Sequence, residues 1–126
     1  MKFLKEFVVY RSKAFGYALE GIITVVVTQP NMRIIAVSAV GAVVAGLLLG
    51  LNYLEWSLVL VAVFFIWMAE TFNTALEFVV DLVSPEFHPL AKKAKDAAAG
   101  AVLVAIILSI SLAALVMLPK LIGRFQ

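Results

Sequence analysis

Four polar side chains interrupt the long hydrophobic segment 56–83: Glu70, Asn73, Glu77 and Asp81. At about 100° per residue on a helix, all four fall within an arc of roughly 80°. An ionised carboxylate near the middle of a bilayer costs at least about 2.5–3.5 kcal/mol, so such groups usually face a helix bundle, water, a metal ion or a substrate. This acidic stripe is therefore the first candidate site. Polar contacts between packed helices are the alternative interpretation.

Two kinds of chemistry suit carboxylates in such a place. In metal-assisted phosphoryl transfer, hard oxygen ligands bind Mg²⁺, a lysine contacts phosphate, and one carboxylate takes a proton from the attacking hydroxyl. The pair Lys95-Asp96 follows the stripe and could supply the lysine. A proton relay or an ion pathway would also need buried acids. The residues alone leave both open, but the sequence lacks the glycine-rich phosphate loops of P-loop enzymes and protein kinases.

The composition indicates an integral membrane protein. Of 126 residues, 64% are hydrophobic and only 14% are charged, whereas a soluble domain is about 45–50% apolar and about 25% charged. The mean hydropathy is +1.09. The sequence has no cysteine, which excludes disulfides and Cys-based zinc sites, and a net charge of +2 is too small to indicate nucleic-acid binding. We predict an all-α membrane protein with one domain over residues 1–126.

The chain divides into one surface helix and three membrane spans. Residues 1–28 mix basic and large apolar side chains, a pattern typical of an amphipathic helix lying on a membrane surface. Gln29, Pro30 and Asn31 are expected to break this helix. The predicted transmembrane helices are 32–51, 56–83 and 94–118, each long enough to cross the hydrocarbon core. A turn at 52–55 and a loop at 84–93 connect them, and Pro119 is expected to end the third span.

The basic residues predict the orientation in the membrane. Lys and Arg gather in the N-terminal segment and the second loop, whereas the first loop has none and the tail has Lys120 and Arg124. The N-terminus and the second loop should therefore be cytoplasmic. The acidic stripe then opens toward the side of the membrane where ATP and magnesium are found.

The polar motif also carries a family resemblance. The pattern Glu70-x-x-Asn73-Thr74-Ala75-Leu76-Glu77-x-x-x-Asp81, followed by Ala94-Lys95-Asp96, resembles the signature of the prokaryotic diacylglycerol kinases, a family that includes the undecaprenol kinases. The similarity runs from about residue 12 to residue 118. It implies a homotrimer in a bacterial-type inner membrane. It also implies transfer of the γ-phosphate of MgATP to a lipid hydroxyl at the cytoplasmic interface.

The resemblance implies roles for individual residues of the stripe. Glu70 matches the general base, and Asn73 matches a residue beside it that positions substrate or base. Glu77 matches a ligand that holds Mg²⁺ against the nucleotide, and Asp81 is expected to support this network. Gln29 stands where many members have a second acidic metal ligand. Its amide oxygen can still bind Mg²⁺, but without charge, so Asn31 or water could complete the site.

The other nucleotide-contacting positions lie outside the stripe. The resemblance places them at Tyr17, Glu86, Phe87, His88, Lys95 and Asp96, with Lys95 expected on phosphate. Diacylglycerol and undecaprenol both present one primary hydroxyl; segments 29–33 and 97–101 look more like the undecaprenol kinase branch and favour that lipid. The alternatives are a noncatalytic membrane scaffold and an ion-conducting oligomer. The second is disfavoured because the segment before Glu70 is wholly apolar.

Overall fold

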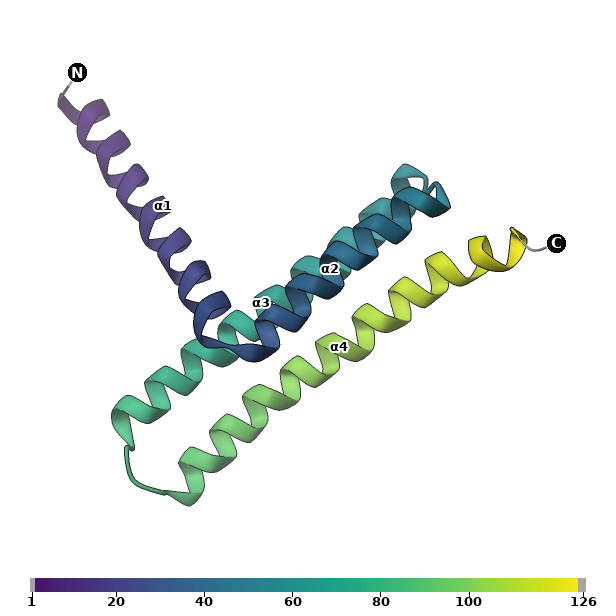
Figure 1. Cartoon of the computed structure of the whole chain (residues 1–126). Helices are drawn as coiled ribbons and strands as arrows, with labels where there is room; N and C mark the ends of the chain where they lie inside the picture. Colours follow the sequence, from purple (N-terminus) through teal and green to yellow (C-terminus); the bar gives the residue numbers. More distant parts are fainter. Residues whose placement is uncertain (1, 125–126) are drawn as a thin grey trace.

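The computed structural model describes residues 2–124 and folds them into four α-helices (Figure 1). They are α1 (Lys2–Thr28), α2 (Pro30–Leu49), α3 (Tyr53–Val83) and α4 (Pro89–Gly123). The helices α2, α3 and α4 are each long and apolar enough to cross a membrane. The predictions of an all-helical chain and of three membrane spans are thereby confirmed.

The three long helices lie side by side, and α1 leaves them at an angle (Figure 1). Helix α3 packs mainly against α4, and α2 lies along both. Among residues 4–28, most side chains of α1 are exposed, and only Val25 near its end is buried, against Met32 and Ile35 of α2. The location of α1 on a membrane surface stays a prediction.

The corner between α1 and α2 is a single residue. Gln29 has extended backbone angles, φ −100° and ψ 114°, and Pro30 occupies the first turn of α2. Proline suits that position because its fixed φ is helical and its missing N–H would have no partner there. The expected break is therefore at Gln29 alone, whereas Pro30 and Asn31, which were expected to share in it, belong to α2. Arg33 of α2 stabilises the corner, because its Nη2 donates a hydrogen bond to the carbonyl of Val27 in α1 at 3.0 Å.

Side-chain and backbone caps fix the turn between α2 and α3. Gly50 ends α2 with φ 63°, a left-handed conformation that glycine adopts without strain. Asn52 then caps α3: its Oδ1 accepts the N–H groups of Leu54 and Glu55, and the Glu55 carboxylate accepts the N–H of Asn52 at 2.7 Å. This capping box starts α3 at Tyr53 rather than at Trp56, so the predicted turn at 52–55 is shorter than expected.

The helix of the third span is longer than expected at both ends. Helix α4 starts at Pro89 rather than at Ala94, because proline again fits a first turn and His88 Nδ1 accepts the N–H of Leu90 at 3.2 Å. It also continues through Pro119 to Gly123. A proline this close to the end of a helix removes one hydrogen bond where the helix is about to finish. Contacts with the α2–α3 turn compensate for that loss.

These contacts come from Lys120, in the last turn of α4, and from Arg124, the residue that follows the helix. Lys120 pairs with Glu55 at 3.0 Å and donates to the carbonyl of Gly50 at 3.2 Å, and Arg124 donates to the carbonyl of Leu48. Cations are favourable beside the carbonyls that end a helix, here α2. They tie the end of α4 to the turn between α2 and α3.

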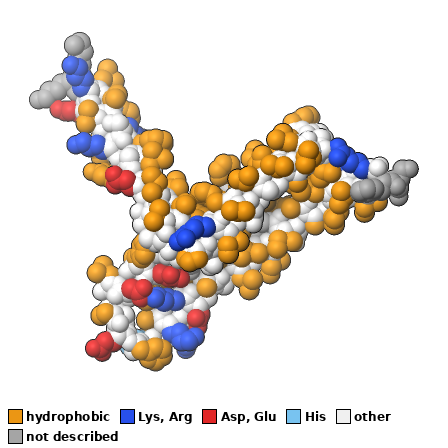
Figure 2. Space-filling view, in the orientation of Figure 1, with side chains coloured by type: hydrophobic (Ala, Val, Ile, Leu, Met, Phe, Trp, Pro, Cys, Tyr) orange, Lys and Arg blue, Asp and Glu red, His pale blue; other side chains and the backbone are white. Residues whose placement is uncertain are grey.

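The surface of the bundle is mostly hydrophobic. In Figure 2, apolar side chains cover the middle of the bundle, and charged ones gather near the α3–α4 connection, at the opposite tip and along α1. Large apolar side chains point outward along all three long helices, among them Val40, Phe64 and Val104. This distribution suits helices whose outer surface meets hydrocarbon, because lipid tails are as apolar as these side chains.

Candidate active site

The carboxylate of Glu70 is buried in the middle of α3. The residue is 1% exposed, and its Oε2 has no hydrogen-bond partner within residues 2–124. The amide of Asn31, in the first turn of α2, faces this carboxylate within interaction range. A buried charge without a partner is costly, so such a group usually serves a ligand, a cation or a proton. Glu70 therefore has the burial and the free oxygen expected of a proton acceptor.

Asn73 contacts Glu77 rather than Glu70. Its Nδ2 donates to Oε1 of Glu77 at 3.1 Å, the spacing of one helical turn. Asn73 is 8% exposed, and its Oδ1 is buried without a partner in the described part of the chain. Glu70 Oε2 and Asn73 Oδ1 are thus two unpaired acceptors on one face of α3. A cation, or a ligand with two N–H or O–H donors, would satisfy both.

The oxygen atoms of the stripe are chemically suited to Mg²⁺. Between residues 2 and 124, no group of three His, Cys, Asp or Glu side chains is arranged to hold a metal ion by itself. Magnesium in phosphoryl-transfer enzymes commonly takes one or two carboxylates and completes its shell with phosphates and water. Glu77, held by Asn73, fits a metal shared with a nucleotide. Gln29 lies at the half-buried corner between α1 and α2, and its role as a ligand stays a prediction.

Lys95 lies beside the acidic stripe, across the α3–α4 contact. Its Nζ pairs with Oδ1 of Asp81 at 2.6 Å. Asp81 follows Glu77 by one helical turn, so this pair places an ammonium group at the open end of the stripe. Asp96, the next residue, pairs with Lys92 at 2.5 Å on the exposed surface of α4. Exposed pairs of this kind contribute little stability, typically below about 1 kcal/mol, so phosphate could replace either carboxylate.

The remaining predicted nucleotide contacts are not brought to the stripe within one chain. Glu86, Phe87 and His88 form the exposed connection between α3 and α4. Besides its predicted role, His88 caps α4. Tyr17 is 69% exposed in the middle of α1, on the helix that leaves the bundle.

Two features of the site were not apparent in the sequence. Asn31 was considered only as a substitute metal ligand, yet it faces Glu70. The cap at His88 was also missed, although a polar residue before Pro89 is a recognisable helix start. No sequence pattern could have paired Asn31 with Glu70, because they lie on different helices.

Comparisons with known proteins point to one family. Residues 16–117 match the family model described as prokaryotic diacylglycerol kinase. The chain is 39% identical over 109 residues to an undecaprenol kinase of Bacillus subtilis, covering 86% of this chain and 89% of that protein. It is also 39% identical over 111 residues to a diacylglycerol kinase of Synechocystis, covering 87% and 63%. A diacylglycerol kinase of Escherichia coli K12 is 33% identical over 98 residues, covering 78% and 80%.

Proposed function

This chain belongs to the prokaryotic diacylglycerol kinase family and is a membrane lipid kinase, and we propose that it transfers the γ-phosphate of MgATP to the hydroxyl of a lipid alcohol at the cytoplasmic interface. The observation that carries the proposal is the buried Glu70 carboxylate with its unpaired Oε2. A buried charge without a partner destabilises the fold. In a membrane scaffold, an unpaired carboxylate in the core would bring this cost with no function to offset it.

In this reaction Glu70 is the general base. As the lipid oxygen attacks the γ-phosphorus, the hydroxyl proton moves to Glu70 Oε2 and ADP leaves with the electrons of the broken bond. Asn73, on the same face of α3, helps to position the substrate or the base. The burial of both groups keeps water from competing as the nucleophile, and a base so placed typically contributes about 10²–10⁴-fold to the rate.

Glu77 and Lys95 are the groups proposed to hold the phosphates. A Mg²⁺ ion bound with ATP at Glu77, assisted by Gln29, would neutralise charge on the phosphate oxygens. Asn73 keeps the Glu77 carboxylate in one orientation through the bond to Oε1. Lys95 exchanges Asp81 for a phosphate oxygen when nucleotide binds. Tyr17, Glu86, Phe87, His88 and Asp96 are proposed to contact the rest of the nucleotide.

Undecaprenol is the proposed lipid. Segments 29–33 and 97–101 resemble the undecaprenol kinase branch, and the similarity to the B. subtilis undecaprenol kinase covers 89% of that protein. The proposal competes with diacylglycerol, the substrate named for the Synechocystis relative at the same identity. The lipid must therefore be identified by direct assay.

The active enzyme is proposed to be a homotrimer with its N-terminus in the cytoplasm. The distribution of Lys and Arg supports the orientation. The position of Tyr17 in the middle of α1, the helix that leaves the bundle (Figure 1), supports a site completed by a second copy.

The test is phosphate transfer by the purified chain in detergent with Mg²⁺ and labelled ATP. Undecaprenol and diacylglycerol are offered separately, to wild type, Glu70→Gln and Glu20→Gln. Glu20 lies on the exposed face of α1 and serves as the matched control. We expect transfer to one lipid, lost by at least about a hundredfold in Glu70→Gln and retained in Glu20→Gln. Equal activity of the two variants would remove Glu70 from the reaction, and no transfer to either lipid would refute the proposed reaction.

A further inference from the structure

The indole N–H of Trp67, in the middle of α3, is a buried donor that the fold leaves without an acceptor. The side chain as a whole is half-buried, but its Nε1 atom is buried and has no hydrogen-bond partner within residues 2–124. A buried tryptophan N–H usually finds a partner, because an unsatisfied buried donor destabilises the fold. The N–H of Trp67 is therefore a polar group whose acceptor has to be identified.

Three buried polar side-chain atoms lack a partner in the described part of the chain, and all three belong to α3. They are Nε1 of Trp67, Oε2 of Glu70 and Oδ1 of Asn73. Neighbouring members are three residues apart, so they occupy successive turns within an arc of roughly 120°. One donor is thus followed by two acceptors along the face that carries the acidic stripe. A row of this kind suits a ligand that both accepts and donates hydrogen bonds.

Trp67 and Glu70 lie against the same turn of α2. Trp67 packs on the buried cluster at the corner between α1 and α2, which includes Met32. Asn31, the residue before Met32, faces Glu70. The indole and the carboxylate are therefore neighbours under one turn of α2, at the end of that helix where the reacting groups are proposed to meet.

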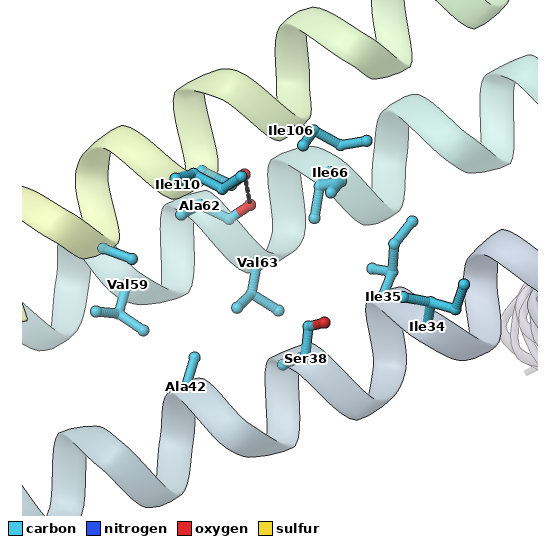
Figure 3. A pocket seen from close by; sticks show the side chains of 13 residues that line it. Ile34, Ile35, Ser38, Ala42, Val59, Ala62, Val63, Ile66, Ile106 and Ile110 are labelled. Carbon is cyan, nitrogen blue, oxygen red and sulfur yellow. Dashed lines mark hydrogen bonds between the residues drawn. The ribbon is translucent and has the colours of Figure 1, made fainter.

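The contact between α2 and α3 turns apolar on the other side of Trp67. Ile35 and Ile66 point into the space between the two helices and line an apolar groove there (Figure 3). Trp67 is not among the residues that line this groove. Its N–H thus belongs to the polar end of the contact, one helical turn from Glu70.

The donor and the acceptor are close on the helix, yet they do not bond to each other. Residues three apart on a helix are surface neighbours, with about 5–6 Å between their Cβ atoms. Side chains on a helix lean toward its N-terminus, so the Glu70 carboxylate lies over the turn that carries Trp67. Both atoms are nevertheless unpaired within residues 2–124. One hydroxyl group between them would satisfy both, accepting from Nε1 and donating to Oε2.

From this pairing we propose that Trp67 also binds the hydroxyl of the lipid alcohol, donating its indole N–H to the oxygen whose proton Glu70 accepts. The inference rests on the proposed function and adds a substrate-binding residue to it. The hydroxyl oxygen has two lone pairs, of which one accepts the N–H and the other attacks the γ-phosphorus. The proton moves to Glu70 Oε2, and ADP leaves with the electrons of the broken P–O bond. Trp67 keeps its own proton throughout and orients the nucleophile.

A neutral donor suits this position. A cationic donor would hold more strongly the electrons that the oxygen must give to phosphorus, because charge-assisted hydrogen bonds are about twice as strong as neutral ones. A buried water molecule would also satisfy the indole and the carboxylate. The experiments must therefore separate a substrate contact from a structural water.

The kinetic test removes the N–H of Trp67 and keeps an aromatic ring. Trp67→Phe does this with a smaller ring, and replacement of Trp67 by benzothienylalanine, in which sulfur takes the place of N–H, also keeps the shape. Trp56→Phe is the matched control, because Trp56 is the other tryptophan of the chain and packs on Gly46, away from the stripe. We expect kcat/KM for the lipid alcohol to fall about three- to tenfold in both Trp67 variants, the usual effect of losing one neutral hydrogen bond. The KM for ATP should stay unchanged, and Trp56→Phe should keep both constants.

A spectroscopic test needs no turnover. The indole N–H signals of the full chain with isotope-labelled tryptophan are recorded by NMR in detergent, without ATP, while undecaprenol or diacylglycerol is added. Trp56→Phe assigns the Trp67 signal. We expect the Trp67 N–H proton to shift downfield with the lipid that is phosphorylated, while the Trp56 signal stays in place. A hydrocarbon of the same chain without oxygen should give no such shift.

Two results would overturn the proposal. One is a Trp67 signal that does not respond to either lipid alcohol, or that responds equally to the hydrocarbon; the N–H then serves a structural water or ring packing. The other is a wild-type kcat/KM in the benzothienylalanine chain. Both measurements remain decisive if Trp67→Phe does not fold, because they keep the shape of the tryptophan side chain.

The failures of the two proposals are distinguishable. If wild type phosphorylates a lipid while the Trp67 signal and the benzothienylalanine chain show no effect, the assignment of Trp67 is wrong and the kinase reaction stands. If the Trp67 signal responds to a lipid alcohol while no phosphate is transferred, the contact stands and the proposed reaction fails.

Discussion

Asn73 donates a hydrogen bond to Glu77, and within residues 2–124 its own carbonyl oxygen is buried without a partner, as is Oε2 of Glu70 on the same face of α3. One amide thus serves both halves of the proposed site. Its nitrogen orients the carboxylate expected on Mg²⁺, and its place on the same face as Glu70 suits it to position the lipid substrate or the base. This arrangement makes Asn73 the residue whose substitution should disturb metal and lipid together.

We predict that Asn73→Ala raises the Mg²⁺ concentration needed for half-maximal rate by about 10–100-fold, the usual effect of losing a group that orients a metal ligand. Its kcat should fall as well, because the substrate or the base is positioned less well. Rates measured across a Mg²⁺ titration test this. Thr71→Val is the control, since the Thr71 hydroxyl bonds only to the carbonyl of Trp67 in its own helix. An unchanged Mg²⁺ dependence in Asn73→Ala would contradict the assigned role.

The Lys95–Asp81 pair predicts unequal effects of its two members. Lys95→Met should raise the KM for ATP by about tenfold or more, because an ion pair to phosphate is lost. Asp81→Asn should leave the KM for ATP unchanged or lower it, since Lys95 no longer has to leave a carboxylate. Lys93→Met, exposed on α4, is the control. The KM for ATP of each variant is measured by ATP titration at saturating lipid. An equal rise of this KM in Lys95→Met and Asp81→Asn would show that the pair acts only as a structural contact.

His88 caps α4 and is also proposed to contact the nucleotide, and two variants can test these roles separately. His88→Ala removes the acceptor for the N–H of Leu90 and should cost about 1 kcal/mol of stability, whereas His88→Asn keeps a good cap and should cost little. Thermal unfolding in detergent measures this difference. ATP binding measured on the same two variants then tests the second role. If both variants bind ATP as tightly as wild type does, His88 caps α4 but does not contact the nucleotide.

Gly46 is predicted to be essential for the contact of α2 with α3. A Cβ atom there would lie 2.7 Å from Cη2 of Trp56, too close for any real contact. Gly46→Ala should therefore lower the free energy of unfolding by about 1–3 kcal/mol through overpacking. In Gly41→Ala the added methyl meets open space, so stability should rise or stay level. Adding Trp56→Phe to Gly46→Ala should restore part of the loss, and a thermal-shift comparison that shows no such rescue would refute the contact.

Much of the fold was predictable because it depends on short-range patterns. Hydrophobic segments long enough to cross a bilayer identified three membrane helices, and the break after residue 28 was placed correctly, although α2 already begins at Pro30. The errors lay at helix ends, where long-range contacts compete with local signals. Pro119 is a strong local stop, yet α4 passes it, and the last turns are tied to the α2–α3 turn by Lys120 and Arg124.

The sequence by itself determined the acidic stripe, since residues on one helix at spacings of three and four share a face wherever that helix lies. It also determined that Asn73 and Glu77 could bond, being one turn apart. Only the tertiary structure decided that Asn31 faces Glu70, that Lys95 meets Asp81, and that an apolar groove leads away from the stripe. These relationships join different helices, and the packing of α2, α3 and α4 sets which of their faces meet and in what register.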